Sequence, residues 1–405
     1  MKFILKKENL FIRIAIGFAI GILLGLFAPQ FSIDTKFIGD IYLNLIKMMV
    51  IPILICAVMS GILGSSEVAS LGRIAFKTVV LYIVMFLASF AVSFCVAMLI
   101  RPGMGIVFEK QPVYEGEVLG SVSISDVLLE IFPDSIFEAF SSNNILPTLL
   151  FAVLLSVAII AIGEKGKPVK DFVISLSRAM FKMLSFVMEL SPIGVASLIA
   201  YSIAEYGSGL FMAIGKYILC CWLACIAVFI IVFLIPVKVY VRIDTNRFLT
   251  ACSKVAFMTL STTSSAATLP TTIKVSTEDL GAPKDISSFT LPLGCTINMC
   301  GGACSFCCLS VFVTDFYSIS ISPAQIAAMA VVATLINMAA PGIPGGGIVL
   351  MTSFLTIFNM PLGLIGPIAA VYRLLDMAFT TINVEGDIAA NLMIAKSERR
   401  SISSL

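Results

Sequence analysis

A row of polar side chains that could bind a ligand lies within a long apolar stretch near the end of the chain. Its members are Arg373, Asp376, Thr380, Asn383 and Asp387. They follow one another at intervals of three or four residues, so a helix would carry them on one face. A charge at the centre of a membrane helix costs roughly 2.5–3.5 kcal/mol and generally persists where it pairs or lines a wet site. The row therefore predicts a ligand and ion site, with a polar seam between two helices as the alternative.

The composition assigns the chain to the membrane. Of its 405 residues 59% are hydrophobic and 12% are charged, and long apolar runs recur from end to end. Runs of about 20 residues predict an all-α polytopic membrane protein, because each is long enough to span a bilayer as a helix. A barrel would show segments of about ten residues with alternating polarity. The net charge of +2 gives no indication of nucleic acid, and the absence of histidine removes the commonest metal ligand and catalytic base.

Six long helices are expected in the first part of the chain. We place them at about 10–29, 37–64, 74–101, 126–163, 169–206 with a kink at Pro192, and 210–240. Lysine and arginine cluster at both ends of the chain and after every second helix, whereas the segment 102–125 is acidic. If the basic ends face the cytoplasm, both termini are cytoplasmic and the acidic segment lies outside.

The last part of the chain is expected to contain interrupted helices. The segment 257–272 is very rich in serine and threonine, and 337–347 contains two prolines and four glycines. Both are typical of half-helices that meet at a tip, where hydroxyl groups satisfy the freed backbone groups. Between them, 291–303 is an apolar helix that a glycine pair interrupts.

A six-residue pattern indicates an internal repeat. Thr-Ile-Asn-x-x-Gly occurs at 296–301 and again 85 residues later at 381–386, each time after an interrupted segment. A hairpin followed by a broken helix, present twice, is the organisation of secondary transporters with inverted repeats. Unwound backbone at Asn-x-x-Gly would offer carbonyl groups to Na⁺, and the N-termini of half-helices would attract a substrate carboxylate.

Further motifs run along nearly the whole chain. They are Lys47-Met-Met-Val-Ile-Pro52, Leu71-Gly-Arg73, Arg101-Pro-Gly, Leu146-Pro-Thr148, Ser191-Pro-Ile-Gly-Val195, Ser264-Ser265 with Leu269-Pro270, Gly342-Ile-Pro-Gly345, and Leu375-Asp-Met with Asn383-Val-x-Gly-Asp387. Together with the repeat they closely resemble the dicarboxylate/amino acid:cation symporters, the family of the glutamate transporters and the neutral amino acid exchangers.

This resemblance implies a fold and an assembly. The expected fold has eight transmembrane helices, two re-entrant helical hairpins at about 244–280 and 322–358, and inverted repeats in an elevator-type transporter. The expected domains are scaffold helices one and two at 1–73, transport-domain helix three at 74–101, the outer loop with scaffold helices four and five at 102–206, and the rest of the transport domain at 207–405. A homotrimer in the inner cell membrane is implied, and no organic cofactor.

The resemblance also implies roles for single residues. Asp376 would bind the substrate α-amine, with Thr380 and Asn383 beside it. The other substrate contacts would be Ser264, Ser265, Gly302, Gly342, Ile343, Pro344, Gly345, Arg373 and Phe379. One Na⁺ would bind to Gly294, Asn298, Asn383 and Asp387, and a second to the carbonyl groups of Thr296, Asn337, Met338 and Ala340. Carboxylate and carbonyl oxygens are the ligands that hard cations require.

Three positions depart from the family pattern. Carriers of glutamate and aspartate have an arginine at the position of Phe379, which binds the side-chain carboxylate of the substrate as phenylalanine cannot. Cys300 replaces a carboxylate of a third Na⁺ site, and Gly302 replaces a threonine that contacts acidic substrates. We therefore expect a neutral amino acid with a larger or more apolar side chain as substrate, and at most two Na⁺. Coupling to H⁺, for which Glu385 and Asp387 could titrate, and an acidic amino acid or dicarboxylate substrate are the alternatives.

Two other interpretations, a metal site and an intramembrane protease, have less support. The four cysteines at 300–308 share one helix, and four thiols on one helix cannot surround a metal without a partner segment, so we interpret them as small packing residues. An intramembrane aspartyl protease needs two aspartates nearly in contact, whereas Asp376 and Asp387 would lie about 16 Å apart along one helix. The sequence therefore predicts a transporter and not an enzyme.

Overall fold

The computed structural model describes residues 10–64, 72–105, 132–142, 145–207, 209–338 and 346–398, and its regular structure in these ranges is helical. Most of the outer loop, the start of the fourth expected helix and the second interruption, 339–345, lie outside the described residues. By length and composition, three described helices could cross a membrane, Arg73–Ile100, Gly209–Val241 and Lys284–Phe316, and the bent pair Gly163–Val187 with Ser191–Glu205 would make a fourth. The expected total of eight therefore stays a prediction.

The first helices are divided by a proline and packed through glycines. α1 (Leu10–Phe27) ends before the short α2 (Pro29–Asp34), and α3 (Lys36–Met48) and α4 (Val50–Gly64) follow. α1 packs along α10 (Ser191–Tyr206) through Gly17, Gly21 and Gly25, which recur every fourth residue. A Cβ at Gly17 would lie 2.2 Å from the carbonyl oxygen of Pro192. The glycine row thus permits a close backbone approach that larger residues would block.

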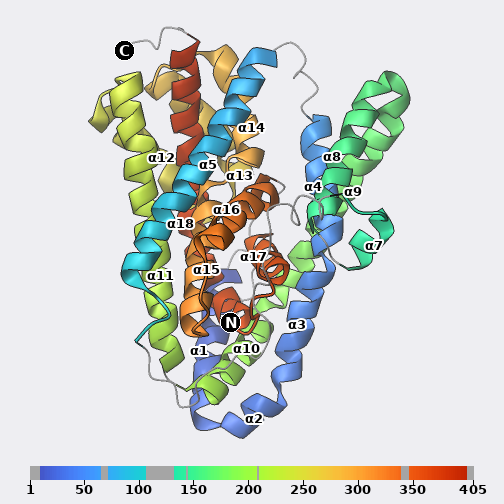
Figure 1. Cartoon of the computed structure of the whole chain (residues 1–405), viewed down its shortest axis with the longest axis vertical. Helices are drawn as coiled ribbons and strands as arrows, with labels where there is room; N and C mark the ends of the chain where they lie inside the picture. The colour runs from blue at the N-terminus through green and yellow to red at the C-terminus, as the bar shows by residue number, and fades with distance from the viewer. Residues whose placement is uncertain are drawn as a thin grey trace.

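A helical arm lies at the right of the view in Figure 1. It consists of α4, α7 (Ile136–Ser141), α8 (Ile145–Ala161) and α9 (Lys167–Glu189), with the 3₁₀ turn η3 (Gly163–Gly166) between the last two. From this arm the chain bends by 52° into α10. The bend coincides with Pro192 in the first turn of α10, since proline has no amide hydrogen with which to continue the preceding helix. The expected kink is confirmed.

The other helices gather around the long C-terminal helix α18 (Ile365–Ser397). They are α5 (Gly72–Ile100), α11 (Gly209–Val228) with the π-helical segments η4 (Phe229–Leu234) and η5 (Val237–Val241), α12 (Thr245–Thr262), α13 (Ser265–Lys274) with the π-helical η6 (Val275–Asp279), α14 (Lys284–Ile297), α15 (Cys300–Phe316), α16 (Pro323–Met338) and α17 (Gly346–Ile357). Most of α18 is buried. Its polar row therefore points into the protein, where burial costs free energy unless partners are present.

The helices α12 and α13 form a hairpin, as the serine- and threonine-rich segment predicted. The chain reverses at Thr263, which has a left-handed φ of 48°, and the hydroxyl of Ser264 then caps α13 by accepting from the backbone N–H of Ala267. The two helices are antiparallel, so residues later in the second helix contact residues earlier in the first. Near the turn the hydroxyl of Thr271 lies 3.1 Å from the sulfur of Met258, and further away Lys254 pairs with Asp279 at 2.8 Å.

The two copies of Thr-Ile-Asn-x-x-Gly have different backbones. The first copy is unwound, because α14 ends at Ile297 and α15 begins at Cys300, with Asn298 and Met299 in between. The second copy lies inside α18, which is helical without a break from Ile365 to Ser397. The expectation of unwound backbone at both copies was therefore wrong for the second. In α18 the polar side chains, and not free carbonyl groups, face the neighbouring helices.

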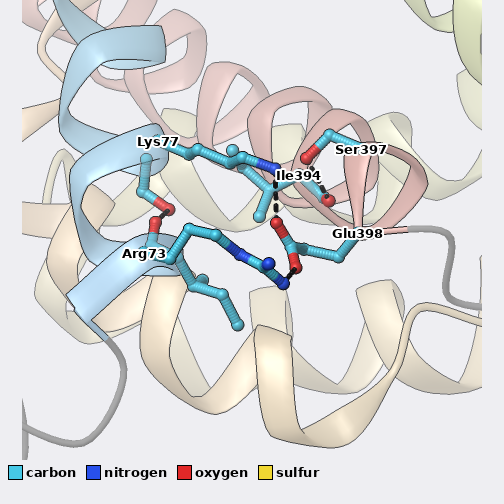
Figure 2. Close-up of polar contacts among 7 residues, drawn as sticks. Arg73, Lys77, Ile394, Ser397 and Glu398 are labelled. Carbon is cyan, nitrogen blue, oxygen red and sulfur yellow. Dashed lines mark hydrogen bonds and ion pairs between the residues drawn. The ribbon is translucent and has the colours of Figure 1, made fainter.

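Ion pairs fasten α5 at both ends. At its start, Arg73 and Lys77 each contact one carboxylate oxygen of Glu398, at 2.5 Å in both cases, and Glu398 directly follows α18 (Figure 2). At its other end, Arg101 contacts Asp315 of α15 at 2.8 Å. These contacts tie α5 to segments more than 200 residues later in the chain. They join α5 to α15 and to the end of α18, the helix that carries the polar row.

Candidate functional site

A cavity of about 60 Å³ lies where the α12–α13 turn, the α14–α15 break and the middle of α18 meet. It is lined by Thr263, Ser265, Met299, Gly302, Ser305, Phe306, Asn337, Gly347, Leu350, Tyr372, Asp376, Phe379, Thr380 and Asn383. The predicted substrate residues that it brings together are Ser265, Gly302, Asp376, Phe379, Thr380 and Asn383. They come from three helices, α13, α15 and α18, and the folded chain gathers them around one small space.

Other predicted substrate residues lie elsewhere. The hydroxyl of Ser264 caps α13, as described above, and Ser264 is not among the lining residues. Arg373 is not among the lining residues, but its guanidinium donates to the hydroxyl of Thr263, which is one of them, and, at 3.2 Å, to the carbonyl oxygen of Ser261. Arg373 thus fastens α18 to the hairpin tip. The predictions for Gly342–Gly345 fall outside the described residues.

Asp376 is the one carboxylate among the described lining residues. Its side chain is buried, and the hydroxyls of Tyr372 and Thr380 lie 3.5 and 3.4 Å from its Oδ1 atom as potential donors. Both belong to neighbouring turns of α18. A buried carboxylate in the lining of a cavity is a suitable partner for the ammonium group of a ligand.

An apolar wall forms another part of the lining. Phe379 is buried in the lining, together with Phe306, Leu350 and Met299. Among the described lining residues there is no lysine or arginine. The cavity therefore presents one anionic group, several hydroxyl and amide groups and a hydrocarbon surface, which suits a cationic head with a neutral side chain.

The asparagines of the repeated motif make reciprocal contacts across the site. Asn298 of the first copy donates from Nδ2 to Oδ1 of Asp387, just after the second copy, at 2.9 Å. Asn383 of the second copy accepts from the backbone N–H of Gly301, at the end of the first copy, at 2.7 Å. Each copy thus supplies the hydrogen-bond partner of the other. The two copies of the repeated motif therefore form the contact between α18 and the α14–α15 break.

Glycines allow these two segments to approach. A Cβ at Gly301 would lie 2.1 Å from the carbonyl oxygen of Phe379, and one at Gly302 would lie 2.1 Å from Oδ1 of Asn337. Neither distance leaves room for a side chain of any kind. Gly301 is needed because α15 lies against the backbone of α18 at this point, and Gly302 makes room for the side chain of Asn337 from α16.

The residues predicted to bind the first Na⁺ lie together. Asp387 is buried, and a Cβ at Gly294 would lie 2.4 Å from its Oδ1 atom and 2.6 Å from the hydroxyl oxygen of Tyr82. Asn298 contacts the same carboxylate. The hydroxyl of Tyr82 donates a hydrogen bond to the carbonyl oxygen of Thr290 at 2.8 Å. The lone pairs of the hydroxyl oxygen can therefore face a cation. Asn383 lies one turn away.

The second predicted Na⁺ site is only partly described. Thr296 lies in the last turn of α14, and Asn337 and Met338 lie in the last turn of α16, where helical carbonyl groups lack intrahelical partners. The amide of Asn337 donates to the carbonyl oxygen of Met299 at 2.7 Å, which joins the end of α16 to the break. Ala340 is outside the described residues.

The cysteines of α15 do have a partner segment. Cys220, Cys221 and Cys225 of α11 face Cys304 and Cys308, and the sulfur atoms of Cys220 and Cys308 are 3.9 Å apart. Within the described ranges no three metal-ligating side chains are gathered closely enough to hold an ion. All these thiols are buried, and they fill the interface between two helices as small apolar groups.

Eight lining residues were not among the predicted substrate contacts: Thr263, Met299, Ser305, Phe306, Asn337, Gly347, Leu350 and Tyr372. Tyr372 precedes Asp376 by four residues, so the helical spacing of the polar row could have identified it. Met299 contacts Nδ2 of Asn383 through its sulfur at 3.3 Å, and the side chain of Asn337 reaches the cavity from α16. Nothing local in the sequence marks these two roles.

Comparison with known proteins extends over nearly the whole chain. Residues 10–397 match the sequence profile of the sodium:dicarboxylate symporter family. The chain is 28% identical to the proton/sodium-glutamate symport protein of Bacillus subtilis, over 97% of this chain and 93% of that protein. It is 27% identical to the C4-dicarboxylate transport protein of Pseudomonas fluorescens, over 96% and 89%, and 28% identical to that of Yersinia pestis, over 96% and 92%. The matched family and proteins are membrane transporters and not enzymes.

Proposed function

The chain belongs to the sodium:dicarboxylate symporter family, and on that premise we propose that it imports a neutral amino acid together with Na⁺. The observation that carries the proposal is the lining of the cavity, to which Asp376 contributes a carboxylate and Phe379 an apolar surface, and in which no described lining residue is basic. Asp376 binds the α-ammonium group. The α-carboxylate is received near the hairpin turn, where Ser265 begins a helix and offers the N-terminal backbone donors of α13.

Phe379 selects against acidic side chains. A substrate carboxylate next to its ring would be buried without a cationic partner, which costs several kcal/mol. A neutral side chain loses nothing there and gains apolar contact with Phe306 and Leu350.

An acidic amino acid or a C4-dicarboxylate is the second candidate substrate. The relatives named above are a glutamate symporter and C4-dicarboxylate transporters. Arg373 is the cation nearest in sequence to the lining carboxylate, and it would have to leave the hairpin to reach such a substrate. The loss of its two hydrogen bonds opposes that movement.

Sodium is the proposed coupling ion. Its ligands are Asp387, the carbonyl oxygen of Gly294 and the amide oxygens of Asn298 and Asn383, with a second ion at the carbonyl groups of Thr296, Asn337, Met338 and Ala340. The close approach of Gly294 to Asp387 supports the first set. The relative from Bacillus subtilis is named as a proton/sodium symporter, so H⁺ is the competing ion.

Uptake by the purified protein in liposomes tests both parts. Under an inward Na⁺ gradient, labelled alanine, serine, threonine and leucine should accumulate, and unlabelled aspartate, glutamate and succinate should compete poorly. If any of these acids binds more tightly than every neutral amino acid, the substrate proposal is wrong. Uptake that persists in choline and follows an imposed pH gradient would replace Na⁺ by H⁺. Asp387→Asn should flatten the Na⁺ dependence.

We also propose an arrangement of two domains in a homotrimer of the inner cell membrane, with both termini in the cytoplasm. Residues 1–73 and 102–206 form the scaffold, and 74–101 with 207–405 form the transport domain that moves as an elevator with two re-entrant hairpins. The ion pairs of α5 with Glu398 and Asp315 support the assignment of 74–101 to the moving domain. Cross-linking with lysine-reactive reagents of graded length tests the trimer.

A further inference from the structure

We propose that the side-chain amide of Asn337 contacts the side chain of the substrate, and that the substrate is a neutral amino acid whose side chain ends in a hydrogen-bond donor, a hydroxyl or a carboxamide. This inference rests on the proposed function and narrows its substrate class. Asn337 lies in the last turn of α16, is only 3% exposed, and lines the cavity together with Asp376 and Phe379.

One hydrogen bond fixes the direction in which this amide points. Nδ2 of Asn337 donates to the carbonyl oxygen of Met299 at 2.7 Å. A carbonyl oxygen can only accept, so the NH₂ group of the amide must lie on this side and its oxygen on the other. The same carbonyl oxygen also accepts from the backbone N–H of Gly302 at 2.8 Å. The α14–α15 break therefore orients Oδ1 of Asn337.

This oxygen occupies the space where a residue other than Gly302 would begin its side chain. A Cβ at Gly302 would overlap Oδ1 of Asn337, and the three atoms nearest to that Cβ all belong to the Asn337 side chain. Both residues line the cavity. Thus α15 leaves a gap in the lining, and α16 fills it with a hydrogen-bond acceptor.

The acceptor has no donor within the described part of the chain. The hydrogen bond to Met299 uses the nitrogen of the amide, and Oδ1 receives none from a described residue. A buried amide oxygen without a donor is costly. A ligand that donates to it removes that cost, whereas an apolar ligand of the same shape leaves it in place.

The rest of the lining restricts the ligand further. A carboxylate has no proton to donate, and its negative charge is repelled by an amide oxygen. The side chain of threonine, by contrast, offers a methyl group to the apolar surface of Phe379 and a hydroxyl to Asn337. The amide and the phenyl ring together thus favour a neutral side chain that carries a donor.

Two pairs of amino acids of nearly equal shape test this inference: threonine with valine, and asparagine with leucine. Their apparent affinities follow from the rise in unfolding temperature of the purified protein in Na⁺ as each amino acid is added. In wild type, at least one pair should show a preference of about fivefold or more for the member with the donor, as one buried hydrogen bond provides.

Asn337→Leu replaces the amide by hydrocarbon of similar size and should abolish or reverse this preference. Asn337→Ala gives the same comparison if the leucine variant does not fold. The backbone carbonyl group of Asn337, a proposed Na⁺ ligand, is retained in both. Asn391→Leu is the matched control, because the buried amide of Asn391 contacts Ser287 and Thr290 and is not part of the described lining. This control should keep the wild-type preference, whatever its stability.

The outcomes separate this inference from the proposed function. A wild-type protein with no preference in either pair, a preference that survives Asn337→Leu, or one that Asn391→Leu also abolishes overturns the role of Asn337 while the proposed function stands. If aspartate or succinate binds more tightly than all four neutral amino acids, or if no neutral amino acid stabilises the protein, the proposed function and this inference are both overturned.

Discussion

The glycine at the end of the first motif copy offers a severe test of the site geometry. In Gly301→Ala the new Cβ would start 2.1 Å from the carbonyl oxygen and 2.6 Å from the carbonyl carbon of Phe379, whereas real Cβ contacts stay beyond about 3.0 Å. Both obstacles are backbone atoms, so no side chain can turn aside. The helices α15 and α18 must separate by about 0.9 Å or the substitution is not accommodated.

That separation has two costs. Overpacking of this kind destabilises by about 1–3 kcal/mol. A movement of about 0.9 Å along the same direction also lengthens the 2.7 Å hydrogen bond from Gly301 to Asn383 beyond about 3.2 Å, which leaves buried groups unsatisfied at a cost of about 1–3 kcal/mol more. Because Phe379 and Asn383 both line the cavity, substrate affinity should fall together with stability.

The matched control is Gly215→Ala in the middle of α11. No heavy atom lies within 4 Å of the Cβ that it would add, and alanine favours a helix over glycine by up to about 1 kcal/mol. Thermal unfolding in detergent and amino acid uptake in liposomes should show a large loss for Gly301→Ala and none for Gly215→Ala. A Gly301→Ala protein with wild-type unfolding temperature and substrate affinity would refute the close approach of α15 to α18.

Three further predictions follow from single contacts. Asp376→Asn keeps the size of the side chain and removes its charge, so substrate affinity should fall by about tenfold or more; unchanged affinity would contradict the role of Asp376 as the ammonium partner. Phe379→Arg places a guanidinium in the cavity and should make aspartate or glutamate an effective competitor, and continued indifference to both acids would show that this wall does not select the side chain. Lys77, and more weakly Arg73, lower the pKa of Glu398, so its stabilising effect should be complete above the ordinary glutamate value of about 4.3 and disappear as the pH falls through the lowered value. Wild type should therefore unfold at a higher temperature than Glu398→Gln at neutral pH, and the two unfolding temperatures should converge in acid. A difference in unfolding temperature that does not change with pH would contradict this role of Glu398.

The sequence by itself determined the class of protein, most helix positions and the members of the polar row. These features depend on local physics: the length of apolar runs, the helical spacing of Asp376, Thr380 and Asn383, and the effect of Pro192 on its own turn. The hairpin at 262–265 was also predictable, because backbone without helical partners needs hydroxyls nearby. The interruption of the next helix was predictable too, but it falls at Asn298 and Met299 and not at the glycine pair, which lies inside α15.

Only the tertiary structure decided which groups those side chains meet. The sequence pattern could not distinguish an unwound second motif from the continuous α18, because packing by surrounding helices keeps that segment helical. It identified Arg373 as a member of the site, but only the left-handed turn at Thr263 decides that its guanidinium meets a hydroxyl and a carbonyl group of the hairpin. The hydrogen bonds from Asn298 to Asp387 and from Gly301 to Asn383 join segments more than 80 residues apart. Such pairings are set by how α14, α15 and α18 pack, and no local spacing encodes the direction in which an amide points.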